Sequence, residues 1–78
     1  QIMPNPASDF LNIGFQLETA SDIQIRLISM DGKMVLSRMY PNQLLFANTL
    51  EISHLATGSY ILQIESNQGI ISKKIIKQ

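Results

Sequence analysis

The sequence predicts an all-β fold, a small antiparallel β-sandwich of about six to seven strands. Apolar and polar residues alternate along most of the chain, with the period of two that is typical of strands with one buried face. The alternating segments are short and recur about every 8–12 residues between turn-forming residues, which is the spacing of a sandwich. The chain has 78 residues, 45% of them hydrophobic, enough for one domain that we expect to span residues 1–78.

The first two predicted strands place apolar side chains at alternate positions. These positions are Leu11, Ile13, Phe15 and Leu17 in the first strand and Ile23, Ile25 and Leu27 in the second. Between them, residues 19–22 (Thr-Ala-Ser-Asp) are predicted to form a turn. Before them, the segment Pro4-Asn5-Pro6 lacks two backbone donors and disfavours helix, so we expect a corner between strands.

The hairpin that follows the second strand allows two registers. A two-residue loop would place Ile25 opposite Arg38 on the inward face. A three-residue loop ending at Gly32, with that glycine at φ > 0 in a G1 bulge, pairs Leu27 with Val35. The second register keeps apolar residues together and is the one predicted, because a slip of one residue moves every side chain to the other face.

The third strand is predicted over residues 33–40, ending at Pro41-Asn42. Residues 43–56 are ambiguous, because their apolar positions fit either a helix or broken strands. We predict a short strand at residues 50–52 and a tight corner at residues 53–58, with a helix as the alternative.

The clearest strand covers residues 59–66, and a hairpin turn at residues 67–69 leads into the last strand, residues 70–76. That last strand carries isoleucines and polar residues on both faces, so neither face is cleanly apolar. The predicted core consists of Leu11, Ile13, Phe15, Ile23, Ile25, Leu27, Val35, Tyr60, Leu62 and Ile64.

Charge and composition exclude several classes of protein. Six basic and six acidic side chains cancel, so no overall field attracts nucleic acid or an anionic membrane. The chain has no cysteine, which excludes disulfides and thiolate zinc sites. No apolar run approaches the roughly 20 residues of a membrane-spanning helix, so no membrane insertion is expected. The chain begins with Gln1 rather than Met, and we expect it to be a piece of a longer protein.

The sequence offers no catalytic constellation. His54 is the only histidine, and its neighbours Ser53 and Leu55 do not suggest a triad. The carboxylates are scattered singly, and no phosphate-binding glycine motif or calcium loop is present. We therefore predict a protein that is not an enzyme, with no cofactor and no metal.

The C-terminal residues are unusual in being both basic and apolar. Three of the six basic residues fall in the last six positions, beside two isoleucines. Lysines commonly protect exposed edge strands, which predicts an edge strand at residues 73–78 whose lysines reach water. The same residues are candidates for a docking strand that pairs with a partner. Removal of residues 74–78 is expected to leave a domain that still melts cooperatively, unless Ile75 or Ile76 is deeply buried.

Together these motifs resemble the type A C-terminal sorting domain of type IX secretion cargo, found in a group of Gram-negative bacteria. The resemblance covers nearly the whole chain and rests on the order and spacing of its pieces. The matching positions include Pro4, Asn5, Pro6, Gly32, Gly58, Tyr60 and Gly69, and the closing residues Lys73, Lys74, Ile75, Ile76 and Lys77.

The resemblance implies an immunoglobulin-like sandwich at the C-terminus of a secreted protein. Such a domain is a non-catalytic address label that crosses the outer membrane with its fused N-terminal cargo. It is recognised by the type IX translocon and then typically cleaved off by a surface sortase-like peptidase, so the cargo ends up secreted or on the cell surface. The residues expected to contact the translocon are the closing five; the other matching positions are expected to be structural.

A second class of function stays open beside this one. The chain could be a passive immunoglobulin-like spacer or a carbohydrate-binding module attached to a secreted enzyme. Its tyrosines and phenylalanines could stack on sugars, although Phe15 and Tyr60 are in phase with the core. The basic and apolar tail distinguishes the two classes, because a spacer does not need it.

Overall fold

The computed structural model describes residues 2–4 and 6–78, and these residues form β-strands and turns with no helix. The five strands are β1 (Ile2–Met3), β2 (Phe10–Ser29), β3 (Met34–Glu51), β4 (Gly58–Ser66) and β5 (Gly69–Lys77). The predicted all-β, antiparallel fold is confirmed. The predicted count of six to seven strands differs from these five, because two of the strands are much longer than the sequence suggested.

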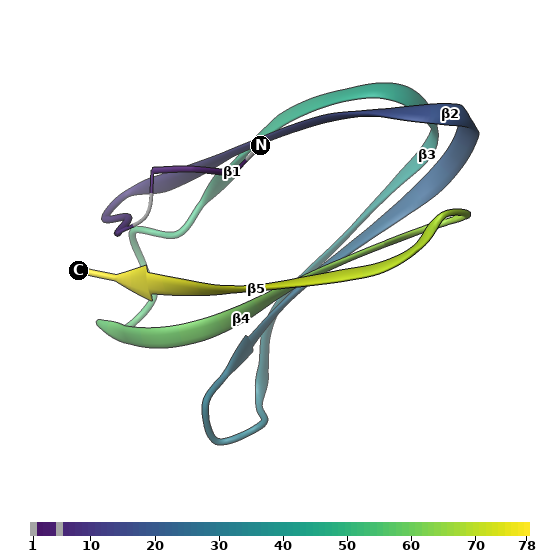
Figure 1. Cartoon of the computed structure of the whole chain (residues 1–78). Coiled ribbons are helices and arrows are strands. Elements are labelled where there is room, and N and C mark those ends of the chain that lie inside the picture. Colours follow the sequence, from purple (N-terminus) through teal and green to yellow (C-terminus); the bar gives the residue numbers. More distant parts are fainter. Residues whose placement is uncertain (1, 5) are drawn as a thin grey trace.

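All five strands belong to one antiparallel sheet, in which β1, β2, β4 and β5 are neighbours in that order and β3 pairs with β2. Strands β2 and β3 bend together, so the sheet folds over on itself (Figure 1). The first half of β2 lies between β1 and the second half of β3. The second half of β2 lies between the first half of β3 and β4. One core therefore forms between two layers that share the same long strands.

The bend lies where the sequence predicted a turn and a strand end. Gln16 pairs with Leu45 and Ser21 pairs with Gln43, so residues 17–20 of β2 have only Leu44 opposite them. On β3 the bend is accommodated by Asn42, whose φ is 54°. Asparagine tolerates this left-handed conformation better than most residues. The predicted strand breaks at residues 19–22 and at Pro41-Asn42 are wrong, because these residues bend the strands without ending them.

Asn67, in the turn between β4 and β5, fixes the bend from the opposite layer. Its backbone N–H donates to the Ser21 hydroxyl at 2.9 Å, and its side-chain amide donates to Thr19 Oγ1 at 2.8 Å. On the other side, the Asn42 N–H donates to an Asp22 carboxylate oxygen at 3.0 Å. The bent residues of β2 are thus bonded to both neighbouring elements.

The ambiguous residues 43–56 contain no helix. The second half of β3 continues through them to Glu51, and the chain then turns with a hydrogen bond from Leu55 N–H to the Ile52 carbonyl at 3.0 Å. Ile52 itself is buried and donates its N–H to the Asp9 carbonyl at 2.9 Å. The predicted short strand was therefore correct in type and too short at its N-terminal end.

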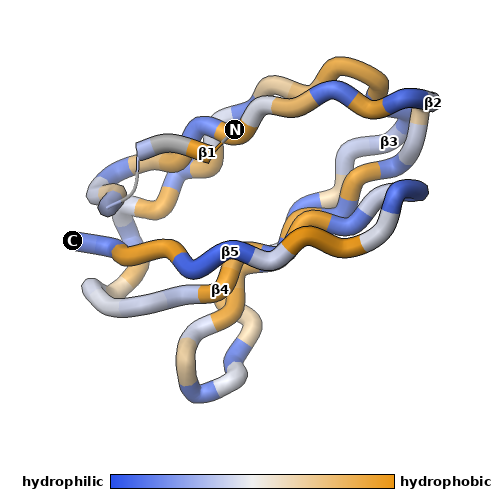
Figure 2. Tube along the Cα trace, viewed as in Figure 1, coloured by the Kyte–Doolittle hydropathy of each residue, from blue (hydrophilic) through white to orange (hydrophobic). Residues whose placement is uncertain are grey.

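The core forms one cluster that contains eight of the ten predicted residues, the exceptions being Phe15 and Val35, which are half-buried and pack against it. Apolar residues alternate with polar ones along the tube in Figure 2. The cluster also contains residues that the prediction omitted. These are Ala7, Leu17, Leu36, Phe46, Leu50, Ile52 and Ile75.

The hairpin between β2 and β3 contains the predicted three-residue loop but not the predicted register. Ser29 N–H donates to the Lys33 carbonyl at 2.8 Å, and Gly32 takes φ 86. One residue further, a β-bulge leaves Val35 unpaired, so Leu27 lies opposite Leu36. The predicted pairing of Leu27 with Val35 is wrong for this reason. The bulge places Leu36 in the core, while Arg38 reaches water because β3 is the edge strand here.

Replacing Gly32 by valine is expected to destabilise the domain by about 1–3 kcal/mol, because a β-branched residue at positive φ is strained. A Cβ at Gly32 would meet no atom within 4 Å, so the cost comes from the backbone alone. Gly32→Asn is the matched control and should cost less, since asparagine adopts this conformation more easily. Urea unfolding measures both variants, and equal losses would contradict the backbone explanation.

Candidate functional site

The candidate site is strand β5, which forms a hairpin with β4 and lies at the edge of its layer (Figure 1). The two strands pair without interruption from Ser66 opposite Gly69 to Gly58 opposite Lys77. Gly69 takes φ 114, a region that favours glycine and lets the chain enter β5 directly from the turn. The regular ladder fixes which β5 side chains face the core and which face solvent.

The five closing residues divide between core and surface. Ile75 is fully buried opposite Tyr60, and Lys77 is 8% exposed, with its Nζ donating to the Gln78 carbonyl at 2.8 Å. Lys73 and Lys74 are exposed, as predicted. The expectation that all the tail lysines reach water is wrong for Lys77, because it extends from the same face of the strand as Ile75.

The exposed apolar side chains of this hairpin lie at both ends of β5. Ile70 and Ile71 are 59% and 63% exposed near the turn, and Ile76 is 42% exposed near the C-terminus. The polar residues 72–74 separate them, a pattern visible along β5 in Figure 2. The surface of β5 therefore combines exposed lysines with exposed isoleucines.

Ala7 holds the end of β5 from its outer side. Its N–H donates to the Ile76 carbonyl at 2.8 Å, and its carbonyl accepts from Gln78 N–H at 2.7 Å, a parallel bridge. Ala7 is buried, whereas Pro4 and Pro6 before it are exposed. Asn5 lies outside the described residues. No feature of the sequence predicts this contact, because it joins residues about 70 positions apart through backbone groups alone.

Two further positions of the matching motif, Gly58 and Tyr60, lie at the start of β4, while Gly32 lies in the β2–β3 hairpin. Gly58 takes φ 150, and the buried Tyr60 donates its hydroxyl to the Ala56 carbonyl at 2.5 Å. This bond satisfies the polar end of an aromatic ring that packs beside Ile75 in the β4–β5 pair. Gly58 and Tyr60 thus stabilise the corner that precedes the β4–β5 hairpin.

Glu51, the last residue of β3, lies together with Ser53 and His54, which follow it, a grouping that the sequence pattern does not indicate. His54 Nδ1 is 3.7 Å from a Glu51 carboxylate oxygen, and Ser53 donates its hydroxyl to the other oxygen. That hydrogen bond lowers the pKa of Glu51 below its usual value. A hydrolytic triad needs the histidine between the serine and the acid. Here the carboxylate lies between the other two, and all three residues are exposed.

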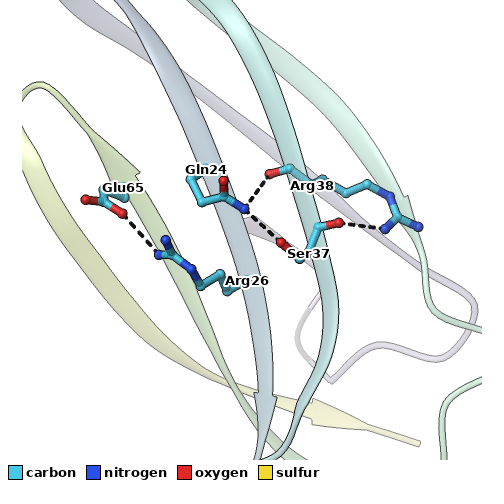
Figure 3. A network of polar contacts seen from close by, with 5 residues as sticks. All are labelled: Gln24, Arg26, Ser37, Arg38 and Glu65. Carbon is cyan, nitrogen blue, oxygen red and sulfur yellow. Dashed lines mark hydrogen bonds and ion pairs between the residues drawn. The ribbon is translucent and has the colours of Figure 1, made fainter.

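A polar network covers the outer face of the layer that contains β4 (Figure 3). Arg26 and Glu65 form an ion pair at 3.1 Å, and the Gln24 amide donates to the Ser37 hydroxyl at 2.8 Å. The Arg38 guanidinium donates to the Ser37 carbonyl at 2.7 Å. Because the paired groups are partly exposed, we expect the ion pair to stabilise the domain only slightly.

Neither a metal-binding cluster nor a membrane-spanning helix is found among the described residues. These residues include no group of three His, Cys, Asp or Glu side chains placed to hold a metal ion. Nor do they form a helix long and apolar enough to cross a membrane. Three of the five aromatic residues pack on one another: the Phe46 ring stacks on Phe15 and meets the edge of Tyr40, with centroids 5.0 and 4.9 Å away. Tyr60 is buried and Phe10 is 45% exposed.

The fold and the hairpin define a small all-β module whose last strand places some side chains in the core and others on the surface. The family model described as "Secretion system C-terminal sorting domain" matches residues 1–78, the whole chain. The chain belongs to this family, the C-terminal sorting domains of type IX secretion, as the sequence resemblance predicted. Searches of the curated proteins and of the solved structures found no match.

Proposed function

We propose that the chain is the C-terminal address of a longer secreted protein and directs its fused N-terminal cargo through the type IX machinery of a Gram-negative bacterium to the cell surface. The match of the sorting-domain family over the whole chain carries this proposal. In this proposal the domain is non-catalytic, passes from the periplasm across the outer membrane, and is cleaved by a surface sortase-like peptidase after export.

The division of the closing five residues between core and surface suggests how the translocon recognises the domain. The exposed Lys73 and Lys74 are the proposed contacts with the translocon, while the buried Ile75 and Lys77 hold the strand that presents them. Recognition then requires a folded domain rather than a free peptide. The two-layer packing around one core supports the immunoglobulin-like architecture that the family resemblance implies. No observation favours the alternative of a spacer or a carbohydrate-binding module.

A reporter fused to the N-terminus of this chain tests the proposal in a strain that carries the type IX system. We expect the wild-type fusion at the cell surface or in the medium, and the same fusion in the periplasm of a strain without the system. Cell fractionation measures both. If the wild-type fusion stays in the periplasm of the competent strain, the chain is not a sorting signal.

Charge removal tests which residues are contacted. The double variant Lys73→Ala/Lys74→Ala is expected to lower export, while Lys33→Ala/Arg38→Ala, which removes the same charge from exposed positions around β3, should not. Thermal unfolding of both variants shows whether the fold survives; exposed charges contribute only about 0–1 kcal/mol each. Equal export of the two variants would remove Lys73 and Lys74 from the proposed contact.

A further inference from the structure

Among the described residues, a backbone partner covers the outer edge of β5 near its C-terminal end. Ala7 bonds to Ile76 and Gln78 there, and in an antiparallel strand the backbone groups that face away from the partner recur at every second residue. The N–H and C=O groups of Ile70 and Ser72 therefore face the same outer edge. No described segment pairs with β5 at residues 70–72 on this side. These residues present backbone groups to which another strand can bond.

The opposite edge of the sheet, formed by β3, is protected. The Arg38 guanidinium donates a hydrogen bond to the Ser37 carbonyl, and the Gln43 amide donates to the Pro41 carbonyl at 2.8 Å. Both carbonyls therefore already have a partner. Pro41 supplies no N–H, and Asn42 at φ 54 interrupts the regular strand. Such devices prevent the addition of strands from other molecules. Residues 70–72 of β5 carry none of them, so the two edges differ in a way that favours one docking position.

A small, mostly apolar cleft lies beside this edge, with a volume of about 110 Å³. Phe15 and Leu17 of β2 line it together with Ile64 of β4 and Ile71 of β5, and Gln16, Ser66, Gln68 and Gly69 complete the lining. Ile71 is 63% exposed although it points to the same face of β5 as the buried Ile75. The layers therefore leave an apolar recess at this end, large enough for one side chain of moderate size.

The charge beside the cleft identifies the chemistry of a suitable partner. Lys73 is exposed and lies two residues from Ile71, so the two side chains extend from the same face of β5. An added strand that placed an apolar side chain opposite Ile71 would place its second-next residue opposite Lys73. A carboxylate at that position would meet the lysine, and cross-strand pairs of opposite charge are favourable.

We propose that residues 70–72 form a strand-addition site for an extended segment of a secretion-machinery protein, with an apolar side chain in the cleft and an acidic one opposite Lys73. This inference rests on the proposed sorting function and deepens it. It moves the centre of recognition from the last five residues to the beginning of β5, where the edge is open. Backbone bonds would supply affinity and the cleft would supply specificity, as in other cases of strand addition.

The variant Ser72→Pro tests the backbone part of the site. Proline removes the outward N–H without removing a bond to β4, and edge positions tolerate it for that reason. Ser72→Ala is the matched control, because it loses the hydroxyl and keeps the N–H. With the reporter fusion, we expect Ser72→Pro to lower surface export roughly tenfold, the effect of losing about one strand hydrogen bond at the upper end of its net range. Ser72→Ala should export like wild type.

The variant Ile71→Glu tests the cleft and stands in for Ser72→Pro if thermal unfolding shows that the proline variant does not fold. Glutamate there places a carboxylate at the apolar recess and repels an acidic partner strand. Leu45→Glu is the control, since Leu45 is 72% exposed on the protected β3 edge. We expect loss of export for Ile71→Glu and normal export for Leu45→Glu.

The outcomes separate this inference from the proposed function. If wild type is not exported, the sorting function fails and this site fails with it. If wild type is exported and a folded Ser72→Pro or Ile71→Glu variant is exported equally well, the sorting function stands and the strand-addition site is overturned. If purified wild type dimerises at micromolar concentration and Ser72→Pro does not, the occupant is a second copy of this chain and the proposed partner is wrong.

Discussion

Replacing Phe46 by alanine is expected to lower the free energy of unfolding by about 3–5 kcal/mol, the range for deleting a large buried aromatic side chain. Phe46 is fully buried in the second half of β3, just after the bend. Its ring stacks on Phe15 and meets the edge of Tyr40, and aromatic pairs add about 0.5–1.5 kcal/mol beyond their buried area. A domain of this size has a total stability of only about 4–12 kcal/mol at the usual value per residue.

Leu45→Ala is the matched control for this prediction. Leu45 is the preceding residue of the same strand, points to the opposite face and is 72% exposed, so its loss should change stability by about 0.5 kcal/mol or less. Urea unfolding monitored by circular dichroism measures both variants. A larger loss for Leu45→Ala than for Phe46→Ala would mean that the second half of β3 is shifted by one residue, with its faces exchanged.

The importance of Phe46 was not predictable from the sequence. Leu44, Leu45 and Phe46 are consecutive apolar residues, so neither a period of two nor a helical period selects the buried one. The bend decides it, because residues 17–20 of β2 have only Leu44 opposite and regular pairing resumes with Gln16 and Leu45. Where alternation was clean, as from Ile23 to Leu27, the predicted core positions were all confirmed.

The predicted register of the β2–β3 hairpin was wrong for a different reason. The loop and the conformation of Gly32 followed from local turn chemistry and were correct. The bulge at Val35 does not follow from local turn chemistry. It depends on Leu36 reaching the core and on β3 being an edge strand, which lets Arg38 reach water. Both conditions are set by the tertiary structure, which alternation along one strand does not encode.

The sequence predicted the edge position of the last strand but not how its side chains divide between core and surface. Three lysines near the end identified β5 as an edge strand, which the topology confirms. The pattern gave no way to tell Ile75 from Ile76, because both faces of the strand carry isoleucines. The burial of Ile75 follows from its pairing with Tyr60, and the hold on Ile76 and Gln78 comes from Ala7 at the other end of the chain.

Deleting residues 74–78 is therefore expected to unfold the domain, in contrast to the small effect that the sequence suggested. The deletion removes the fully buried Ile75 and both backbone bonds to Ala7. Losing a buried isoleucine side chain costs about 2–5 kcal/mol, and each lost hydrogen bond costs about 0.5–1.5 kcal/mol. The sum approaches the whole stability expected for a domain of this size, so we expect no cooperative thermal transition.

Single substitutions separate the structural part of the tail from its recognition part. Ile75→Ala should lower the free energy of unfolding by about 2–5 kcal/mol, while Ile71→Ala, a change of the same type on the same face of β5, should lower it by about 0.5 kcal/mol or less because Ile71 is 63% exposed. Thermal and urea unfolding measure both. A truncated domain that melts cooperatively at the wild-type temperature would show that the end of β5 is not part of the core. Loss of export by a folded Ile71→Ala variant, with its stability unchanged, would assign that side chain to recognition, whereas loss of export by Ile75→Ala is expected to follow its loss of folding.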